Sequence, residues 1–488
     1  MPPTRTEIER NLAETTHKVL SGDFTGITQD SREVKPGYIF AALPGTRVDG
    51  RDFIPQALEM GATGIIAQTG TLLPGNKRKI LLIESDNPHQ RFSQICAAYY
   101  KDQPETIAAV TGTNGKTSTA HFAAQLWKAL GYKSASMGTL GLVRDGKASS
   151  SSSLTTPDPV TLHKQLAELT EEGITHLCME ASSHGLEQYR LDGVRLAVAG
   201  YTNLSRDHLD YHADMESYLA AKLRLFSEVL RKGGTVVLNA DAPEYEKLLK
   251  TSRKAGHTIL SYGRKGEDIR LLESNLHENG QALTLEIADK TYNVPLPLVG
   301  EFQAMNALCA LGLVWAGERE RLDHILKALE NLEPVPGRLQ KISGPRAVYV
   351  DYAHTPDALE TVLKALRPHT KGKLICLFGC GGDRDPGKRP LMGESAARLA
   401  DRVIVTDDNP RSEKPESIRA AILKGIERKE GVTEIGDRRE AIKTAMKQME
   451  PKDVLLVAGK GHETGQIIGS ETLPFDDAQE VRNAMPDH

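Results

Sequence analysis

The sequence has no hydrophobic run long enough to cross a membrane. Its longest apolar stretch, residues 307–316, is far shorter than the roughly 20 residues that a membrane-spanning helix needs. The first ten residues carry charged side chains where a secretory signal peptide would carry its apolar segment. We therefore expect a soluble cytoplasmic protein without a membrane span.

Cysteine and excess positive charge are also scarce. The five cysteines are scattered and form no Cys-x-x-Cys pair, which argues against disulfides and a zinc cluster and fits a reducing compartment. The 61 Lys and Arg residues are outnumbered by 65 Asp and Glu residues, for a net charge of −4. Such a chain has no basic field for nucleic acid and no basic block for a membrane surface, so a small-molecule partner is favoured.

A glycine-rich segment at residues 110–118, Val-Thr-Gly-Thr-Asn-Gly-Lys-Thr-Ser, follows an apolar run and precedes an amphipathic stretch. This order predicts a strand, a phosphate-binding loop and a helix. Gly112 and Gly115 would let backbone N–H groups point at phosphate oxygens, Lys116 would add a positive charge, and the Thr117 hydroxyl could bind Mg²⁺. The glycine expected at position 110 stands at position 112, so the loop is a shortened variant. The alternative is an ordinary glycine-rich turn; we predict binding of a nucleoside triphosphate.

The 488 residues, 39% hydrophobic and 26% charged, suit about three globular domains. Short apolar runs alternate with amphipathic stretches throughout, which predicts α/β domains with parallel strands. Polar segments at residues 101–106 and 333–337 are candidate linkers and hinges, and the serine run at 148–153 is a candidate surface loop. We expect a small N-terminal α/β domain, a central P-loop mononucleotide-binding domain and a C-terminal Rossmann-like, doubly wound domain. The predicted limits are 1–105, 106–335 and 336–488.

Two polar positions in the central region could serve the phosphates. Glu180 follows the apolar run at residues 176–179, from where a carboxylate could reach a magnesium ion at the loop on a neighbouring strand. A solvated acid at a strand end is the alternative. His208 lies in the polar run at residues 203–212 and could bind a metal or a phosphate oxygen, although a structural histidine fits equally well.

Three polar loops in the last third each follow a predicted strand, at residues 379–385, 407–411 and 459–463. Ligands bind at the carboxyl edge of an open parallel sheet, so these loops should converge on one pocket. The alternative for the middle loop, which contains Asp-Asn-Pro-Arg, is a simple β-turn.

The charges in these loops suggest the ligand. Arg384 and Arg411 could each hold a carboxylate through two hydrogen bonds. Asp408 and Glu463 would suit an ammonium group. A ligand that carries both kinds of group is an amino acid.

Taken together, these motifs resemble the Mur ligase family over nearly the whole chain. No single motif would be decisive, but their order and spacing are highly specific. They occupy residues 111–117, 180–185, 203–212, 306, 337–338, 351–356, 381–385, 408–411 and 459–463.

The resemblance implies ATP and Mg²⁺ as cofactors. It assigns the nucleotide to Gly112, Thr113, Asn114, Gly115, Lys116, Thr117, Ser118, Asn306, Arg338 and Asp351. It assigns the metal to Thr117, Glu180, His208 and Lys222, the last as a carbamate formed with CO₂; without the resemblance, Lys222 would be taken for an exposed helix lysine. Lys116, Glu180, His208 and Lys222 would form the catalytic set.

The resemblance also implies the substrates. The Asp-Asn-Pro-Arg loop is similar to that of the branch that adds meso-diaminopimelate to UDP-N-acetylmuramoyl-L-alanyl-D-glutamate, a step of peptidoglycan precursor synthesis. The nucleotide-sugar substrate would contact Ser31, Thr155, Thr156, Ser182, Gln188 and Arg190. The amino acid would contact Arg384, Asp408, Asn409, Pro410, Arg411, Gly459 and Glu463.

The implied reaction is amide ligation through an acyl phosphate, which demands positioning and charge neutralisation rather than a covalent enzyme intermediate. We expect a monomer whose C-terminal domain closes on the phosphates. The nearest rival is a folylpolyglutamate synthetase, which would not be expected to carry this N-terminal domain or the Asp-Asn-Pro-Arg loop. A P-loop ATPase that switches a protein partner is the rival outside the ligases.

Overall fold

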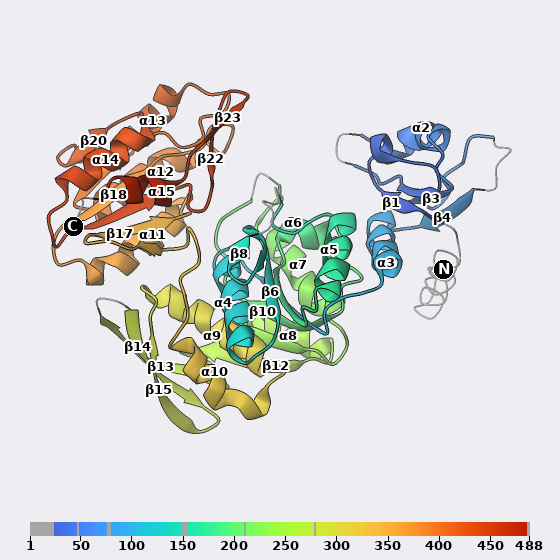
Figure 1. The fold of residues 1–488 in the computed structure, drawn as a ribbon, viewed down its shortest axis with the longest axis horizontal. Helices are drawn as coiled ribbons and strands as arrows, with labels where there is room; N and C mark the ends of the chain where they lie inside the picture. Colours follow the sequence, from blue (N-terminus) through green and yellow to red (C-terminus); the bar gives the residue numbers. More distant parts are fainter. Residues whose placement is uncertain are drawn as a thin grey trace.

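The computed structural model describes residues 24–45, 48–75, 80–148, 154–208, 211–277 and 280–485. The candidate loop at 148–153 lies outside these ranges except for Ala148. Three sheets of four, eleven and six strands follow one another along the chain. They form three bodies in a row, with the N-terminal body at one end and the C-terminal body at the other (Figure 1). The domain limits themselves stay a prediction.

The N-terminal sheet is parallel and has the order β1-β2-β3-β4. Its strand side chains alternate between two small cores, one under α2 and the other under α3. Helix α3 begins where it does because Asn87 caps its first turn and Pro88 occupies the first helical position. The elements are β1 (Gly26–Thr28), β2 (Tyr38–Ala41), β3 (Gly64–Gln68), β4 (Leu81–Ser85), α2 (Ile54–Glu59) and α3 (Pro88–Tyr100).

The central sheet is mixed, with the order β15-β14-β13-β12-β11-β10-β5-β9-β6-β7-β8. Its middle strands are parallel, as predicted, but both edges are antiparallel. The predicted parallel strands are therefore present, and the antiparallel strands at the two edges add to them. The strands are β5 (Thr106–Thr111), β6 (Ser134–Gly138), β7 (Gly141–Arg144), β8 (Lys147–Ala148), β9 (His176–Glu180), β10 (Leu196–Tyr201), β11 (Thr235–Asn239), β12 (Thr258–Gly263), β13 (Ile269–His277), β14 (Gly280–Ile287) and β15 (Lys290–Leu296).

Helices cover both faces of this sheet. Helices α4, α9 and α10 pack on one face of the sheet, and helices α5, α6 and α8 pack on the other. Strands β13, β14 and β15 form an arm that extends away from the centre of the domain (Figure 1). The helices are α4 (Lys116–Ala129), α5 (Pro159–Glu171), α6 (Ser183–Glu187), α7 (Met215–Arg224), α8 (Tyr245–Lys254), α9 (Glu301–Trp315) and α10 (Leu322–Leu329).

The C-terminal sheet has the order β16-β17-β21-β18-β19-β20 and is parallel except for β16. One core lies under α11, α12 and α13 and a second under α14 and α15, so the predicted doubly wound arrangement is confirmed. The strands are β16 (Gln340–Ile342), β17 (Ala347–Asp351), β18 (Leu374–Phe378), β19 (Arg402–Val405), β20 (Val432–Glu434) and β21 (Val454–Ala458), with a hairpin of β22 (Gly465–Ile468) and β23 (Glu471–Pro474). The helices are α11 (Pro356–Leu366), α12 (Lys388–Leu399), α13 (Pro415–Leu423), α14 (Arg438–Gln448) and α15 (Asp477–Asn483).

A buried ion pair joins α14 to α15. The Arg438 guanidinium donates to both carboxylate oxygens of Asp477 at 2.7 Å, and both side chains are 0% exposed. Arg438→Met would leave the Asp477 carboxylate buried without its partner, which typically costs about 3–5 kcal/mol of folding free energy. We expect a clear drop in the thermal unfolding midpoint.

The neighbouring Arg439 supplies the control, because its pair with Glu480 is 51% exposed on the arginine side. Arg439→Met should cost no more than about 1 kcal/mol. Equal shifts of the two midpoints would contradict this account of the α14–α15 contact.

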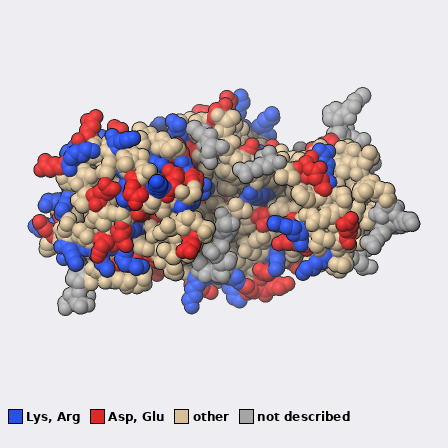
Figure 2. Space-filling model, turned by 90° about the horizontal axis from the view of Figure 1, so that it is seen from above, with Lys and Arg blue, Asp and Glu red and all other residues tan. Residues whose placement is uncertain are grey.

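Several expectations from composition can be compared with the structure. None of the helices in the described ranges combines the length and apolar character of a membrane span. All five cysteines are buried free thiols. On the face seen in Figure 2, acidic and basic side chains are interspersed rather than separated by sign.

Candidate active site

The phosphate loop connects β5 to α4. Gly112 has φ +151° and Gly115 has φ +87°, backbone angles that favour glycine. A Cβ at Gly115 would overlap the Asn306 carboxamide, so the loop and α9 touch here. The Lys116 Nζ donates to the carbonyls of Gly112 at 2.9 Å and Thr113 at 2.8 Å. The predicted strand, loop and helix are thus all present, and a cationic side chain lies across the loop.

A second lysine reaches the same loop from α7. The Lys222 Nζ donates to the Gly112 carbonyl at 2.9 Å and lies 4.2 Å from the centre of the Tyr218 ring. Lys222 is only 1% exposed, so the alternative that it is an exposed helix lysine is wrong. Burial, with the nearby charge of Lys116, holds the pKa of Lys222 well below its usual value. A neutral amine is the form that can react with CO₂.

Glu180 ends β9, the strand beside β5. Its carboxylate accepts from the Thr139 backbone N–H at 2.8 Å and from the Thr139 hydroxyl at 3.1 Å. Glu180 and Thr117 line the same small cavity, and Glu180 is only 2% exposed. The alternative of a solvated strand-end acid is therefore wrong.

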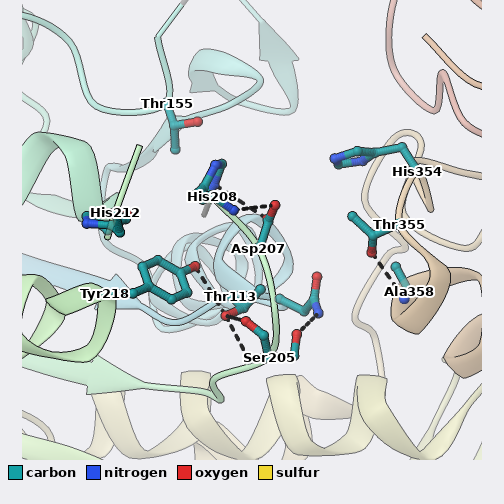
Figure 3. A network of polar contacts seen from close by, with 12 residues as sticks. Thr113, Thr155, Ser205, Asp207, His208, His212, Tyr218, His354, Thr355 and Ala358 are labelled. Carbon is teal, nitrogen blue, oxygen red and sulfur yellow. Dashed lines mark hydrogen bonds and ion pairs between the residues drawn. The ribbon is translucent and has the colours of Figure 1, made fainter. Parts of the chain in front are cut away.

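Asp207 and His208 lie near Thr113 of the phosphate loop (Figure 3). The His208 Nε2 is 3.5 Å from Asp207 Oδ2, and His208 has φ +54°. Burial would raise the pKa of Asp207, but His208, His354 and Lys116 outweigh burial and lower it. His354 belongs to the C-terminal domain, so this carboxylate is placed between the two domains.

The C-terminal domain contributes an arginine to the phosphate loop. The Arg338 Nη2 donates to the Thr117 hydroxyl at 3.4 Å. The buried Asp351 carboxylate accepts from the backbone N–H groups of Leu339 at 2.5 Å and Ala353 at 2.7 Å, and thereby fixes the segment that carries Arg338. Burial raises the pKa of Asp351 to about 6. Asn306 and Arg338 therefore adjoin the loop directly, whereas the Asp351 carboxylate holds the backbone.

The residues assigned to the nucleotide sugar form one cluster in the central domain. The Thr156 hydroxyl donates to the Glu180 carbonyl and accepts from the Ser182 N–H, each at 3.0 Å. The Arg190 guanidinium donates to the Thr156 carbonyl at 2.7 Å and also to Gln188. The Thr155 hydroxyl is 3.2 Å from that of Thr139, the residue that orients Glu180.

Ser31 lies apart from this cluster. Its hydroxyl donates to Gln56 at 3.0 Å within the N-terminal domain. The domains meet instead through α3, where Gln90 donates to Asp192 at 2.8 Å and Ser93 donates to the Arg190 carbonyl at 3.0 Å.

The three polar loops of the C-terminal domain converge, as predicted. They follow β18, β19 and β21, which are neighbours in the sheet. The Arg411 Nη1 donates to the Gly382 carbonyl at 2.7 Å, and a Cβ at Gly381 would lie only 2.8 Å from that nitrogen. Asn409 donates to Glu463 at 2.8 Å.

Other residues of these three loops, which were predicted to bind the amino acid, are also close together. A Cβ at Gly459, which has φ +114°, would lie 2.5 Å from Asp408 Oδ2. Pro410 is buried beside Asn409. Arg384 is exposed, and its guanidinium donates to the Asp383 carbonyl at 3.4 Å.

Lys460 is a residue of these loops that the sequence did not single out. It is 0% exposed, and its Nζ donates to Asn409 and Glu463, each at 2.9 Å. Glu463 therefore already holds one ammonium group. The signal was available, because Lys460 lies between Gly459 and Glu463 in a motif that the resemblance used. Thr139 and Asp207 were missed as well.

The residues present fit a triphosphate with Mg²⁺. Among the described side chains, the Arg338 Nε is a buried donor without a hydrogen-bond partner, next to the phosphate loop. No three His, Cys, Asp or Glu side chains in the described ranges are grouped so that they alone could hold a metal. Mg²⁺ usually takes only one or two carboxylates and completes its shell with substrate phosphates and water, which suits Glu180 and the Thr117 hydroxyl.

Comparison with known proteins identifies the family. Family models match three segments: the Mur ligase family catalytic domain at residues 23–126, the Mur ligase middle domain at 110–314, and the Mur ligase glutamate ligase domain at 337–461. The chain belongs to the Mur ligase family. The predicted family and the predicted three-part α/β fold class are thus confirmed.

The relatives span nearly the whole chain. It is 50% identical over 473 residues to the UDP-N-acetylmuramoyl-L-alanyl-D-glutamate–2,6-diaminopimelate ligase of Bradyrhizobium diazoefficiens, covering 96% of each chain. A solved structure of a ligase with that same name is 37% identical with a TM-score of 0.69, covering 95% of this chain and 94% of the other. The MurF ligase of Thermotoga maritima in complex with ADP shares the fold at 20% identity and a TM-score of 0.62, covering 96% and 97%.

Proposed function

We propose that this chain is an ATP-dependent ligase that joins meso-diaminopimelate to the D-glutamate γ-carboxylate of UDP-N-acetylmuramoyl-L-alanyl-D-glutamate, with release of ADP and phosphate. The observation that carries the proposal is the presence of two groups of side chains: a phosphate loop with Lys116 and Arg338, and three converging loops of mixed charge in the C-terminal domain. The 50% identical relative bears the name of this activity.

In the first step, the substrate carboxylate attacks the γ-phosphorus of ATP and the bond to ADP breaks, which leaves an acyl phosphate. In the second, the amine attacks the acyl carbon, phosphate leaves, and a proton passes from the nitrogen to a base. Positioning and charge neutralisation dominate such transfers. Lys116 and Arg338 can supply the positive charge, because both point at the loop between β5 and α4.

Thr117, Glu180, His208 and carbamylated Lys222 would hold magnesium, which when bound neutralises phosphate charge and orients the transferred group. Thr139 orients the Glu180 carboxylate through two hydrogen bonds. Asp207 lies 3.5 Å from the His208 Nε2 and would help to orient the imidazole. Carbamylation would convert the cation of Lys222 into an anion beside Gly112.

We assign the nucleotide sugar to Ser31 and to the cluster around Thr156, and the amino acid to the loops around Arg411. Thr155, Ser182, Gln188 and Arg190 complete the first group. Arg384, Asp408, Asn409, Pro410, Gly459 and Glu463 complete the second. In this proposal the chain acts as a cytoplasmic monomer of three domains, whose C-terminal domain closes about the linkers at residues 101–106 and 333–337.

Selection of meso-diaminopimelate over L-lysine tests the assignment of Arg411. The former ends in a carboxylate and an ammonium group, the latter in an ammonium group alone. With L-lysine the half-buried Arg411 would lack its carboxylate partner and face a like charge, which costs on the order of 1–3 kcal/mol. Arg411→Ala should therefore reduce the ratio of kcat/KM values for the two amino acids by about 10- to 100-fold.

Arg419→Ala serves as the matched control, because its guanidinium pairs with Asp407 and Glu434 beside the same loop. This variant should keep the wild-type preference. If Arg411→Ala discriminates against L-lysine as well as the wild type does, Arg411 does not bind the distal carboxylate of meso-diaminopimelate.

A further inference from the structure

A row of side chains leads from the phosphate loop into the amino-acid pocket. The guanidinium of Arg338, whose Nη2 contacts Thr117, lies 4.5 Å from the centre of the Tyr352 ring. The Tyr352 ring centre is in turn 5.2 Å from that of His462, with 42° between the planes. These spacings are those of a cation–π contact and of interacting aromatic rings.

The backbone segments that carry these side chains pack directly against one another. A Cβ at Gly337 would overlap the backbone of Gly461 and His462, and a Cβ at Gly461 would lie 2.8 Å from the Tyr352 Cβ. The segment that precedes Arg338 thus packs directly against the loop that carries the amino-acid ligands. Neither segment can shift without displacing the other, because close-packed backbones leave no slack.

The far end of the row reaches the amino-acid pocket through one peptide bond. Glu463 follows His462 and is held by the Nζ of Lys460 and the carboxamide of Asn409, at 2.9 and 2.8 Å. A ligand that reorients Glu463 therefore acts on the His462 backbone.

The electrostatics suit a neutral ring beside a cation. Burial, together with the charge of Arg338, lowers the pKa of His462 to about 3, so its imidazole is neutral at physiological pH. The His462 Nδ1 is one of the buried polar atoms that lack a hydrogen-bond partner in the described part of the chain. Packing against Tyr352 therefore accounts for its placement better than a polar contact does.

We infer that Tyr352 and His462 are positioning residues that couple the two sites through Arg338. ATP bound at the phosphate loop then tightens binding of the amino acid, and bound amino acid tightens binding of ATP. The inference rests on the proposed function, since it takes the pocket at Glu463 as the amino-acid site. Coupling of this kind is reciprocal: each ligand changes the affinity for the other by the same factor. Neither residue needs to touch the reacting atoms.

The test is a binding cycle on the full chain. Calorimetry with the UDP-N-acetylmuramoyl dipeptide present measures the Kd of meso-diaminopimelate without and with Mg²⁺ and a non-hydrolysable ATP analogue. For the wild type we expect the analogue to tighten amino-acid binding by about tenfold, within the usual range of coupling factors. Tyr352→Leu should reduce the factor to less than about twofold, because it removes the ring that Arg338 packs against.

Tyr352→Phe is the matched variant, because it keeps the ring and loses only the hydroxyl; it should retain the wild-type factor. A merely structural role would shift both dissociation constants together and leave their ratio intact. His462→Leu provides a second break in the row if Tyr352→Leu does not fold. A wild-type factor near one, or an unchanged factor in the leucine variants, overturns the inference. Absence of meso-diaminopimelate binding to the wild type in either state would instead overturn the proposed function.

Discussion

Lys116→Ala should lower kcat/KM for ATP by about 10²–10³-fold, the loss typical when one donor to a developing anion is removed. In the structure the Lys116 Nζ donates to two carbonyls of its own loop, those of Gly112 and Thr113. Burial lowers the pKa of Lys116, and the carboxylates of Glu180 and Asp207 counteract part of that effect. A triphosphate would give this poorly solvated cation a full anionic partner.

The same helix provides the control. Lys128, near the other end of α4, is exposed and pairs with Asp145. Lys128→Ala should leave steady-state kinetics unchanged, and both variants should unfold at the wild-type temperature. Near-normal turnover of Lys116→Ala at saturating ATP would show that this amine does not act on the transferred phosphate.

Lys222→Ala should reduce kcat by a similar factor, about 10²–10³-fold, for a different reason. The proposed carbamate supplies a negative charge beside Gly112, and its formation requires the neutral amine that burial favours. Because the pKa is lowered, more of the amine is neutral at pH 7 than in an exposed lysine, so carbamylation is favoured where other lysines stay protonated. The wild type incubated with ¹³C-bicarbonate should therefore show a carbamate signal by NMR that the variant lacks.

Lys250→Ala, on the exposed side of α8, is the comparison for general effects of losing a lysine. Lys222→Glu should recover part of the lost rate, because a carboxylate restores the negative charge. A fully active Lys222→Ala, or a carbamate signal that persists in it, would remove this residue from the proposed catalytic set.

The local chemistry of the chain predicted the positions of the main loops well. Gly112 and Gly115 adopt positive φ angles at the positions where a phosphate-binding loop requires them. Asn87 and Pro88 fix the start of α3. The polar loops after β18, β19 and β21 meet because parallel strands end at a common edge.

What the sequence did not predict depends on contacts between distant segments. Strand β1 has three residues, too few for a recognisable period. The Leu-Ala-Ala-Lys run that ends at Lys222 has the composition of an exposed helix, but in the fold the amine is buried against the Gly112 carbonyl and the Tyr218 ring. His354 helps to lower the pKa of Asp207. It lies 147 residues further along the chain and is brought near by the domain arrangement.

The most direct test of the account is phosphate release from ATP in the presence of the UDP-N-acetylmuramoyl dipeptide, measured with meso-diaminopimelate, with L-lysine and with no amino acid. The account predicts multiple turnovers only with meso-diaminopimelate, accompanied by stoichiometric tripeptide product. Phosphate release at the same rate without an amino acid would contradict it, and so would equal rates with L-lysine.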